Sequence, residues 1–226
     1  MTIAEFQTWL NAHGAKLKAD GVFGPQSRAA LFAVFSNKAA KSVSPFDIAA
    51  FAKRLCVSEK QLKAVAAIES GGAGFDREGR PSILFERHYF HRLTDGKYSP
   101  TVFSDPKSGG YLFPSWEKLA LACSRNVDSA FASASWGKFQ IMGAHWHKLG
   151  YASPLEMAYS MVGSEAAHYD ALCRYVEVMG LRSAMQAIST DPKTCIAFAR
   201  GYNGPQYRKY DYDVKLANAM KIGSTK

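Results

Sequence analysis

Long hydrophobic runs are missing from this chain of 226 residues, and none approaches the roughly 20 apolar residues of a membrane-spanning helix. Residues 1–17 are amphipathic and lack the cationic start and apolar core of an export signal, so we expect no signal peptide. Cysteines are few and form no C-x-x-C pair, which argues against a disulfide framework and predicts buried free thiols. The four are Cys56, Cys123, Cys173 and Cys195.

Metal-site signatures are also missing. The sequence has no H-E-x-x-H motif, and the spacing of its histidines matches no zinc signature with cysteines. The histidines that come closest to suggesting ligands are His88, His91, His145, His147 and His168. We therefore expect no metal and no cofactor.

Acidic residues are fewer than basic ones, 19 against 28, so the chain carries a net charge of +9. This charge attracts polyanions in general, but no nucleic-acid recognition motif accompanies it, and we expect no nucleic-acid partner.

Apolar residues make up 47% of the chain, enough for a real core. Apolar periodicity predicts a mainly α fold with one small β element. The expected helices are 3–10, 25–35, 46–55, 60–69, 115–126, 128–134, 154–161, 164–179, 192–202 and 207–220.

The helix that ends at Glu69 has unusually clear boundaries. Ser58 with Gln61 three residues later forms a capping-box pattern, and the pair at 71–72 is Gly-Gly. Leu62, Val65 and Glu69 share one helical face, so the pattern places a carboxylate on the apolar side. Burial raises the pKa of a carboxyl, as a general acid requires. The alternative is that Glu69 ends a frayed turn and points into solvent.

Glu86 is the candidate for a second carboxylate. It lies 17 residues after Glu69, behind a Gly-containing turn and the β-prone residues 83–85, so a hairpin over residues 73–85 would return it beside the helix. Paired carboxylates are the arrangement of glycosidases. The alternative is a surface ion pair with a neighbouring cation. The rival acids are Asp76, Glu78 and Asp95.

Residues 1–36 predict a small helical hairpin, followed by a linker over 37–45 and a larger domain over 46–226. Thirty-odd residues are few for an independent core, so the hairpin should lean on the rest of the chain. Its string D-G-V-F-G-P-Q-S-R-A-A at 20–30, after F-Q-x-x-L at 6–10, resembles the peptidoglycan-binding domain of wall hydrolases. That resemblance implies wall-binding roles for Asp20, Gly21, Phe23, Gly24 and Arg28. The alternative is that these residues only build the hairpin.

Three further motifs occur in the same order along the chain as in a known family. The segment G-K-F-Q-I-M at 137–142, the segment A-F-A-R-G-Y-N-G at 197–204 and the Glu69-Ser70 pair resemble the goose-type lysozyme and lytic transglycosylase group. The stretch 69–94, with F-E-R-H at 85–88, resembles the N-acetylmuramidase domain of phage endolysins, and the likeness extends over residues 46 to about 222.

The resemblance implies a lysozyme-like α+β fold and an endolysin that hydrolyses the β-1,4 bond between N-acetylmuramic acid and N-acetylglucosamine. By the same resemblance Glu69 is the acid and Glu86 the second carboxylate. The implied substrate-binding residues are Ser70, Asp76, Gly137, Gln140, Tyr202 and Asn203. Their amide and phenol groups suit sugar hydroxyls and acetamido groups. Asn203-Gly204 is also a turn dipeptide by itself.

Three other functions stay open on the sequence. A lytic transglycosylase needs one catalytic carboxylate and gives anhydromuramyl products, whereas Glu86 favours hydrolysis. A zinc amidase and a non-catalytic envelope-binding protein are weaker alternatives. We expect a monomer made in the host cytoplasm that reaches periplasmic peptidoglycan after the membrane is permeabilised, with electrostatic contact to anionic outer-membrane components.

Overall fold

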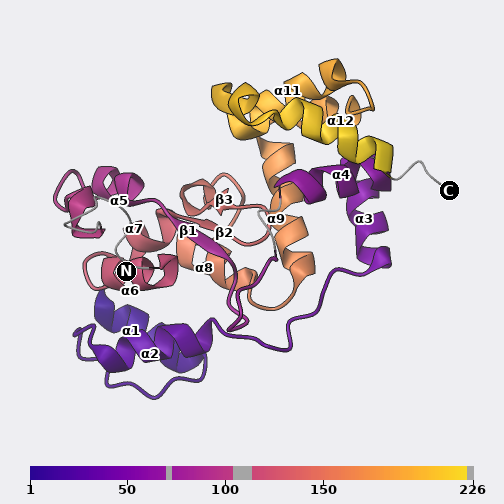
Figure 1. Cartoon of the computed structure of the whole chain (residues 1–226). Coiled ribbons are helices and arrows are strands. Elements are labelled where there is room, and N and C mark those ends of the chain that lie inside the picture. The colour runs from indigo at the N-terminus through magenta and orange to yellow at the C-terminus, as the bar shows by residue number, and fades with distance from the viewer. Residues whose placement is uncertain (70–72, 104–113, 223–226) are drawn as a thin grey trace. The chain divides into compact units, whose positions relative to one another are not determined.

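Helices account for most of the chain in the computed structural model, which describes residues 1–69, 73–103 and 114–222 (Figure 1). The chain divides into two compact units, and each is made of two separate segments. The first unit joins residues 1–40 with 75–163, and the second joins 41–74 with the chain from residue 164. Within the described stretches, no helix is long and apolar enough to cross a membrane.

The first unit combines short helices with the sheet. Its helices are α1 (Ile3–Ala12), α2 (Pro25–Val34), α5 (Arg87–Leu93), α6 (Ser115–Cys123), α7 (Val127–Ala132) and α8 (Pro154–Ser160), with 3-10 turns η1 (Pro100–Phe103) and η2 (Gly143–His145). The strands β1 (Ile83–Phe85), β2 (Ala134–Trp136) and β3 (Ile141–Met142) form an antiparallel sheet in that order. The predicted mainly helical fold with one small β element is confirmed.

The N-terminal hairpin of α1 and α2 shares its core with α6 and α7. Phe6 and Phe35 are fully buried, as are Leu10 and Leu31. The Phe6 ring meets the Phe131 ring edge-on at 5.8 Å, and Phe35 lies 5.4 Å from Trp116 between ring centroids. Figure 1 shows the hairpin beside α6. The hairpin therefore completes its core by packing against the rest of the first unit, as its small size predicts.

The sheet is paired differently from the predicted hairpin. Phe75 and Pro81 form a single antiparallel bridge, and β1 pairs instead with β2, where Leu84 stands opposite Ser135. The prediction that residues 83–85 return against an approach strand is therefore wrong. The partner strand lies about fifty residues later, inside a stretch partly predicted as helix, and three-residue strands carry too little alternation to be recognised.

Helices are the main regular elements among the described residues of the second unit. Its helices are α3 (Pro45–Leu55), α4 (Glu59–Glu69), α9 (Glu165–Val178), α10 (Arg182–Gln186), α11 (Pro192–Asn203) and α12 (Tyr212–Ile222), with the 3-10 turn η3 (Pro205–Tyr210). Helix α12 packs against both α11 and α4 (Figure 1). Arg54 of α3 pairs with Asp170 at 2.6 Å and with Glu177 at 2.7 Å, both on α9. These ion pairs join α3 to α9.

The chain passes from the first unit to the second between residues 40 and 41, inside the predicted linker 37–45. Asn37 donates its backbone N–H to the Gly79 carbonyl at 2.9 Å in the first unit. A Cβ at Gly79 would lie 2.8 Å from the Asn37 backbone, so glycine is required there. In the second unit Glu165 donates to the Lys41 carbonyl at 2.8 Å. Hydrogen bonds at Asn37 and Lys41 thus hold the linker to the first and the second unit, respectively. The division of the chain into domains at 1–36 and 46–226 stays a prediction.

Three of the four cysteines are buried free thiols, and Cys56 is the exception. It is exposed at the C-terminal end of α3, where its backbone adopts a left-handed conformation with φ 55°. The expectation of burial is therefore wrong for Cys56, because the residue lies just past the helix end rather than on its apolar face.

Candidate active site

Helix α4 carries Glu69 on its buried face. The Ser58 backbone donates to Gln61 Oε1 at 2.9 Å and the Gln61 backbone donates to Ser58 Oγ at 3.2 Å, so the predicted capping box is formed. Leu62 and Val65 are fully buried, and Glu69, the last residue of the helix, is only 8% exposed. The solvent-facing alternative is therefore wrong. Ser70 and the Gly71-Gly72 pair lie outside the described residues.

The Glu69 carboxyl has one amide partner and little water. Asn203 Nδ2 donates to Glu69 Oε1 at 2.9 Å. Burial raises the pKa of Glu69 from 4.5 to about 7, and the Asn203 hydrogen bond opposes that rise. A large fraction of the carboxyl is consequently protonated near neutral pH, although it would be almost fully ionised in water.

Two tyrosines complete the surroundings of Glu69. Burial, the larger cause, and the Glu69 charge, a smaller one, raise the pKa of Tyr202 well above its usual value. The same two causes raise the pKa of Tyr212. The Tyr202 ring stacks on Phe198 with centroids 5.6 Å apart. Both phenols therefore stay neutral and remain hydrogen-bond donors. Sequence reasoning missed Tyr212, because no motif distinguishes it within the predicted helix 207–220.

Helix α11 brings Tyr202 and Asn203 to the site in its last turn. Gly204 follows with φ +75°, a backbone conformation that favours glycine, and turns the chain toward η3. Gly204 therefore makes the predicted turn, and Asn203 contacts Glu69. Contact of Tyr202 and Asn203 with substrate stays a prediction.

Glu86 belongs to the first unit, whereas Glu69 belongs to the second. It stands at the N-cap of α5, is half-buried, and donates its backbone N–H to the Ser133 carbonyl at 2.8 Å. Burial lowers the pKa of the nearby Lys118, and so does Arg87, while the Glu86 charge opposes them. The cationic side chain of Lys118 therefore lies within electrostatic reach of Glu86. Its catalytic role stays a prediction.

Gly137 and Gln140 close the turn between β2 and β3. Gly137 has φ +70° and Gln140 has φ +48°. The Gln140 amide donates to the Gly137 carbonyl at 2.8 Å and to the Ser82 carbonyl at 3.2 Å, and it accepts a bond from the Ser135 hydroxyl at 2.8 Å. These hydrogen bonds give Gly137 and Gln140 a structural role in the turn between β2 and β3. Contact with substrate stays a prediction.

Asp76 organises a tight turn of the first unit. Its Oδ1 accepts bonds from the backbone N–H groups of Glu78 and Arg80, both at 2.9 Å. Its Oδ2 accepts from the Arg80 guanidinium, also at 2.9 Å from Nε. With both oxygens occupied in this way, a turn-forming role accounts for Asp76, and its substrate-binding role remains a prediction.

Two of the predicted wall-binding residues, Asp20 and Gly21, build the loop before α2. The buried Gln7 side chain donates to Asp20 Oδ1 at 3.2 Å and to the Val22 carbonyl at 3.1 Å, and it accepts from the Gly21 N–H at 2.9 Å. Gly21 has φ +77°, which suits glycine. The F-Q and D-G parts of the motif are therefore joined through Gln7.

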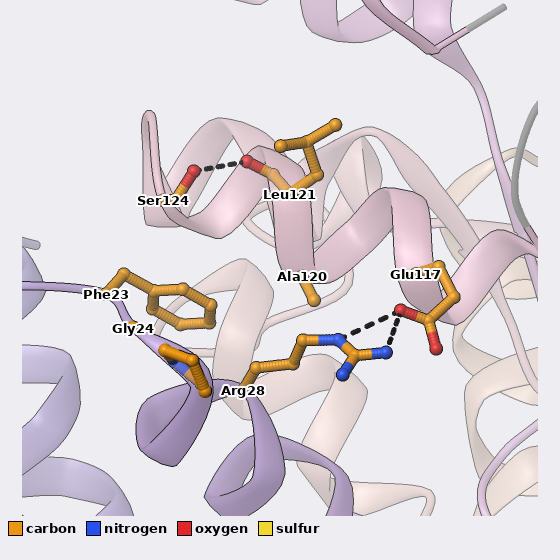
Figure 2. Close-up of a pocket in the computed structure, with 8 residues that line it drawn as sticks. Phe23, Gly24, Arg28, Glu117, Ala120, Leu121 and Ser124 are labelled. Carbon is orange, nitrogen blue, oxygen red and sulfur yellow. Dashed lines mark hydrogen bonds and ion pairs between the residues drawn. The ribbon is translucent and has the colours of Figure 1, made fainter.

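The other three, Phe23, Gly24 and Arg28, line a pocket of about 420 Å³. Figure 2 shows that α6 forms its opposite wall. Arg28 reaches across to Glu117, with its Nε and Nη2 at 3.0 and 2.5 Å from Oε2. The remaining lining residues are Pro25, Ala120, Leu121 and Ser124. The structure thus brings the motif residues together with α6 residues that sequence reasoning missed.

No group of three or more histidine, cysteine, aspartate or glutamate side chains that could hold a metal ion occurs in the described part of the chain.

Comparison with known proteins gives a consistent result. Residues 58–223 match the family described as Muramidase: N-acetylmuramidase. A crystal structure of a Burkholderia AP3 phage endolysin is similar over 98% of this chain and 94% of its own, with 31% identity and a TM-score of 0.71. No curated protein sequence matches the chain. The matched range covers most of the chain and includes Glu69, Glu86, Tyr202 and Asn203. The chain therefore belongs to the N-acetylmuramidase family.

Proposed function

We propose that this protein is a phage endolysin that hydrolyses the β-1,4 bond between N-acetylmuramic acid and N-acetylglucosamine in bacterial peptidoglycan. The observation that carries the proposal is the Glu69 carboxyl, 8% exposed and with a pKa raised to about 7 by burial. The family match supplies the substrate class, and the similar structure is that of a phage endolysin.

In the proposed reaction Glu69 is the general acid. A glycosidic oxygen leaves poorly unless it is protonated, so the Glu69 proton passes to that oxygen as the bond to the sugar C1 breaks. A water molecule then adds its oxygen to the oxocarbenium-like C1 and releases a proton. Glu69 becomes a carboxylate during the step, and the Asn203 amide, which already donates to its Oε1, stabilises that charge.

Glu86 is the proposed second carboxylate, which either stabilises the positive charge at C1 or removes the proton from the attacking water. Both roles place Glu86 near the reacting sugar carbon, and the cationic Lys118 lies within electrostatic reach of its carboxyl group. Replacement of Glu86 by Gln should lower turnover with little change in stability, because the side chain caps no helix N–H.

The lytic transglycosylase is the second candidate. It would use Glu69 in the same way, but the 6-hydroxyl of the muramic acid would replace water as the nucleophile. The alternatives of a zinc amidase and a non-catalytic envelope-binding protein make no use of a protonated buried carboxyl, so they leave the Glu69 environment unexplained.

Lysis of permeabilised Gram-negative cells by matched variants tests the proposal. Glu69→Gln should abolish clearing, because the amide cannot donate an acidic proton. Glu59→Gln is the control, since Glu59 belongs to the same helix but pairs with Lys63 on the surface. Clearing by Glu69→Gln at the wild-type rate would refute the general-acid role.

Access to the substrate is part of the same proposal. The protein would act in the periplasm after the cytoplasmic membrane is permeabilised, as a monomer, with its net charge of +9 attracting anionic outer-membrane components. Its binding to whole cell envelopes should weaken as salt rises, because screening reduces such attraction. A single species of 24.8 kDa in light scattering would support the monomer.

A further inference from the structure

The pocket between the α2 N-terminus and α6 is lined by a charged pair and by apolar side chains (Figure 2). Arg28 pairs with Glu117, and the Phe23 ring and the Ala120 methyl group are among the apolar groups of the lining. Its volume of about 420 Å³ lies in the range of small-ligand sites. The wall-binding motif thus forms only one side of this pocket, and α6 forms the other.

We propose that this composite pocket binds the zwitterionic end of a peptidoglycan stem peptide, with Arg28 holding its carboxylate and Glu117 its ammonium group. The inference rests on the proposed function, because that function supplies peptidoglycan as the ligand. It extends the function by assigning recognition to the peptide rather than to the sugar chain.

Charge complementarity favours the peptide. In Gram-negative walls the stem peptide contains a diamino acid whose distal carbon carries an ammonium and a carboxylate on a short methylene chain. The planar Arg28 fork matches a carboxylate, and Glu117 matches an ammonium group. The methylene chain suits the apolar lining residues Phe23, Pro25 and Ala120. Sugar hydroxyls and acetamido groups are neutral and have no need of a charge pair.

The Arg28–Glu117 pair is also open enough to exchange partners. The two side chains are 50% and 31% exposed, and an ion pair of that kind contributes little to stability because solvent screens it. A ligand that carries both charges can replace each partner without leaving either charge unpaired. An ion pair that served only to hold α2 against α6 would not require a pocket beside it.

The test uses the full chain carrying Glu69→Gln, so that the wall is bound without being degraded. Binding is measured on purified sacculi, on the same glycan strands after their peptides are removed by an amidase, and on the free tripeptide L-alanyl-γ-D-glutamyl-diaminopimelate. Arg28→Ala and Glu117→Gln are the variants. Lys38→Ala, which removes another ion pair of the first unit away from the pocket lining, is the control.

We expect intact sacculi and the tripeptide to bind, and peptide-free strands to bind roughly tenfold more weakly or worse, since charge-assisted bonds are lost. Each pocket variant should weaken binding to a similar degree, and the control should not. Thermal unfolding checks the fold, and Glu117→Gln keeps an oxygen that accepts from Arg28. Equal binding by the variants, or equal binding to stripped strands, would overturn the proposal. Wall digestion by the wild-type protein tests the proposed function separately.

Discussion

Replacement of Glu69 by Gln should make the protein more stable at alkaline pH while removing its activity. The folded carboxyl has a pKa of about 7 against 4.5 for the ordinary group, because burial disfavours its charge. Between these two values the folded state keeps a proton that the unfolded state has lost, so stability of the wild type falls as pH rises through this window and is level above it.

The size of the effect comes from the same shift. A difference of roughly 2.5 pKa units, from 4.5 to about 7, corresponds to about 3 kcal/mol of folding free energy once the carboxyl is ionised. Glutamine has nearly the same shape, does not titrate, and its carbonyl can accept the bond that Asn203 Nδ2 now donates. The variant should therefore match the wild type near pH 4 and exceed it by up to about 3 kcal/mol at pH 8.

Urea unfolding at these two pH values measures the effect, provided that the probe reports the second unit. All four tryptophans lie in the first unit, so their fluorescence follows that unit alone: Trp9, Trp116, Trp136 and Trp146. Far-UV circular dichroism also follows the helical second unit, which contains Glu69. Glu59→Gln is the matched control and should show no gain at pH 8. A Glu69→Gln variant that gains no stability between pH 4 and pH 8 would refute the claim that burial of this carboxylate is costly.

Three other perturbations act on named contacts. Asn203→Ala removes the bond that lowers the pKa of Glu69, so the alkaline limb of the pH–rate profile should move to higher pH. Deletion of residues 1–36 uncovers aromatic rings such as Phe131, so the first unit should lose about 2 kcal/mol for each large side chain exposed, measured by tryptophan fluorescence; an unchanged transition would support an independent domain. Gln7→Leu leaves the Gly21 N–H without its acceptor and should cost about 1–3 kcal/mol in urea unfolding.

The sequence predicts the features that local rules govern. Ser58 and Gln61 form their capping box, and helical spacing correctly places Glu69 on the buried face. In each case the relevant residues lie within one or two helical turns of one another, where spacing alone determines which side chains share a face.

Features that depend on distant residues could not be predicted in this way. The pairing of β1 with β2 joins Leu84 to Ser135 across about fifty residues, and no periodicity in a three-residue strand records its partner. Tyr212 and Glu117 were missed for the same reason, because each belongs to its site only through helix packing. Motif resemblance identified Asn203, but the structure supplies its bond to Glu69.

Mass spectrometry of digested peptidoglycan tests the central claim most directly, because it identifies the bond that is broken and the group that attacks it. Hydrolysis driven by Glu69 predicts fragments that end in reducing N-acetylmuramic acid, and their absence from digests made with Glu69→Gln. Fragments lighter by one water, with an anhydromuramyl end, would mean that the muramic acid hydroxyl attacks and would contradict the hydrolase. Free stem peptides with intact glycan strands would contradict a glycosidase altogether.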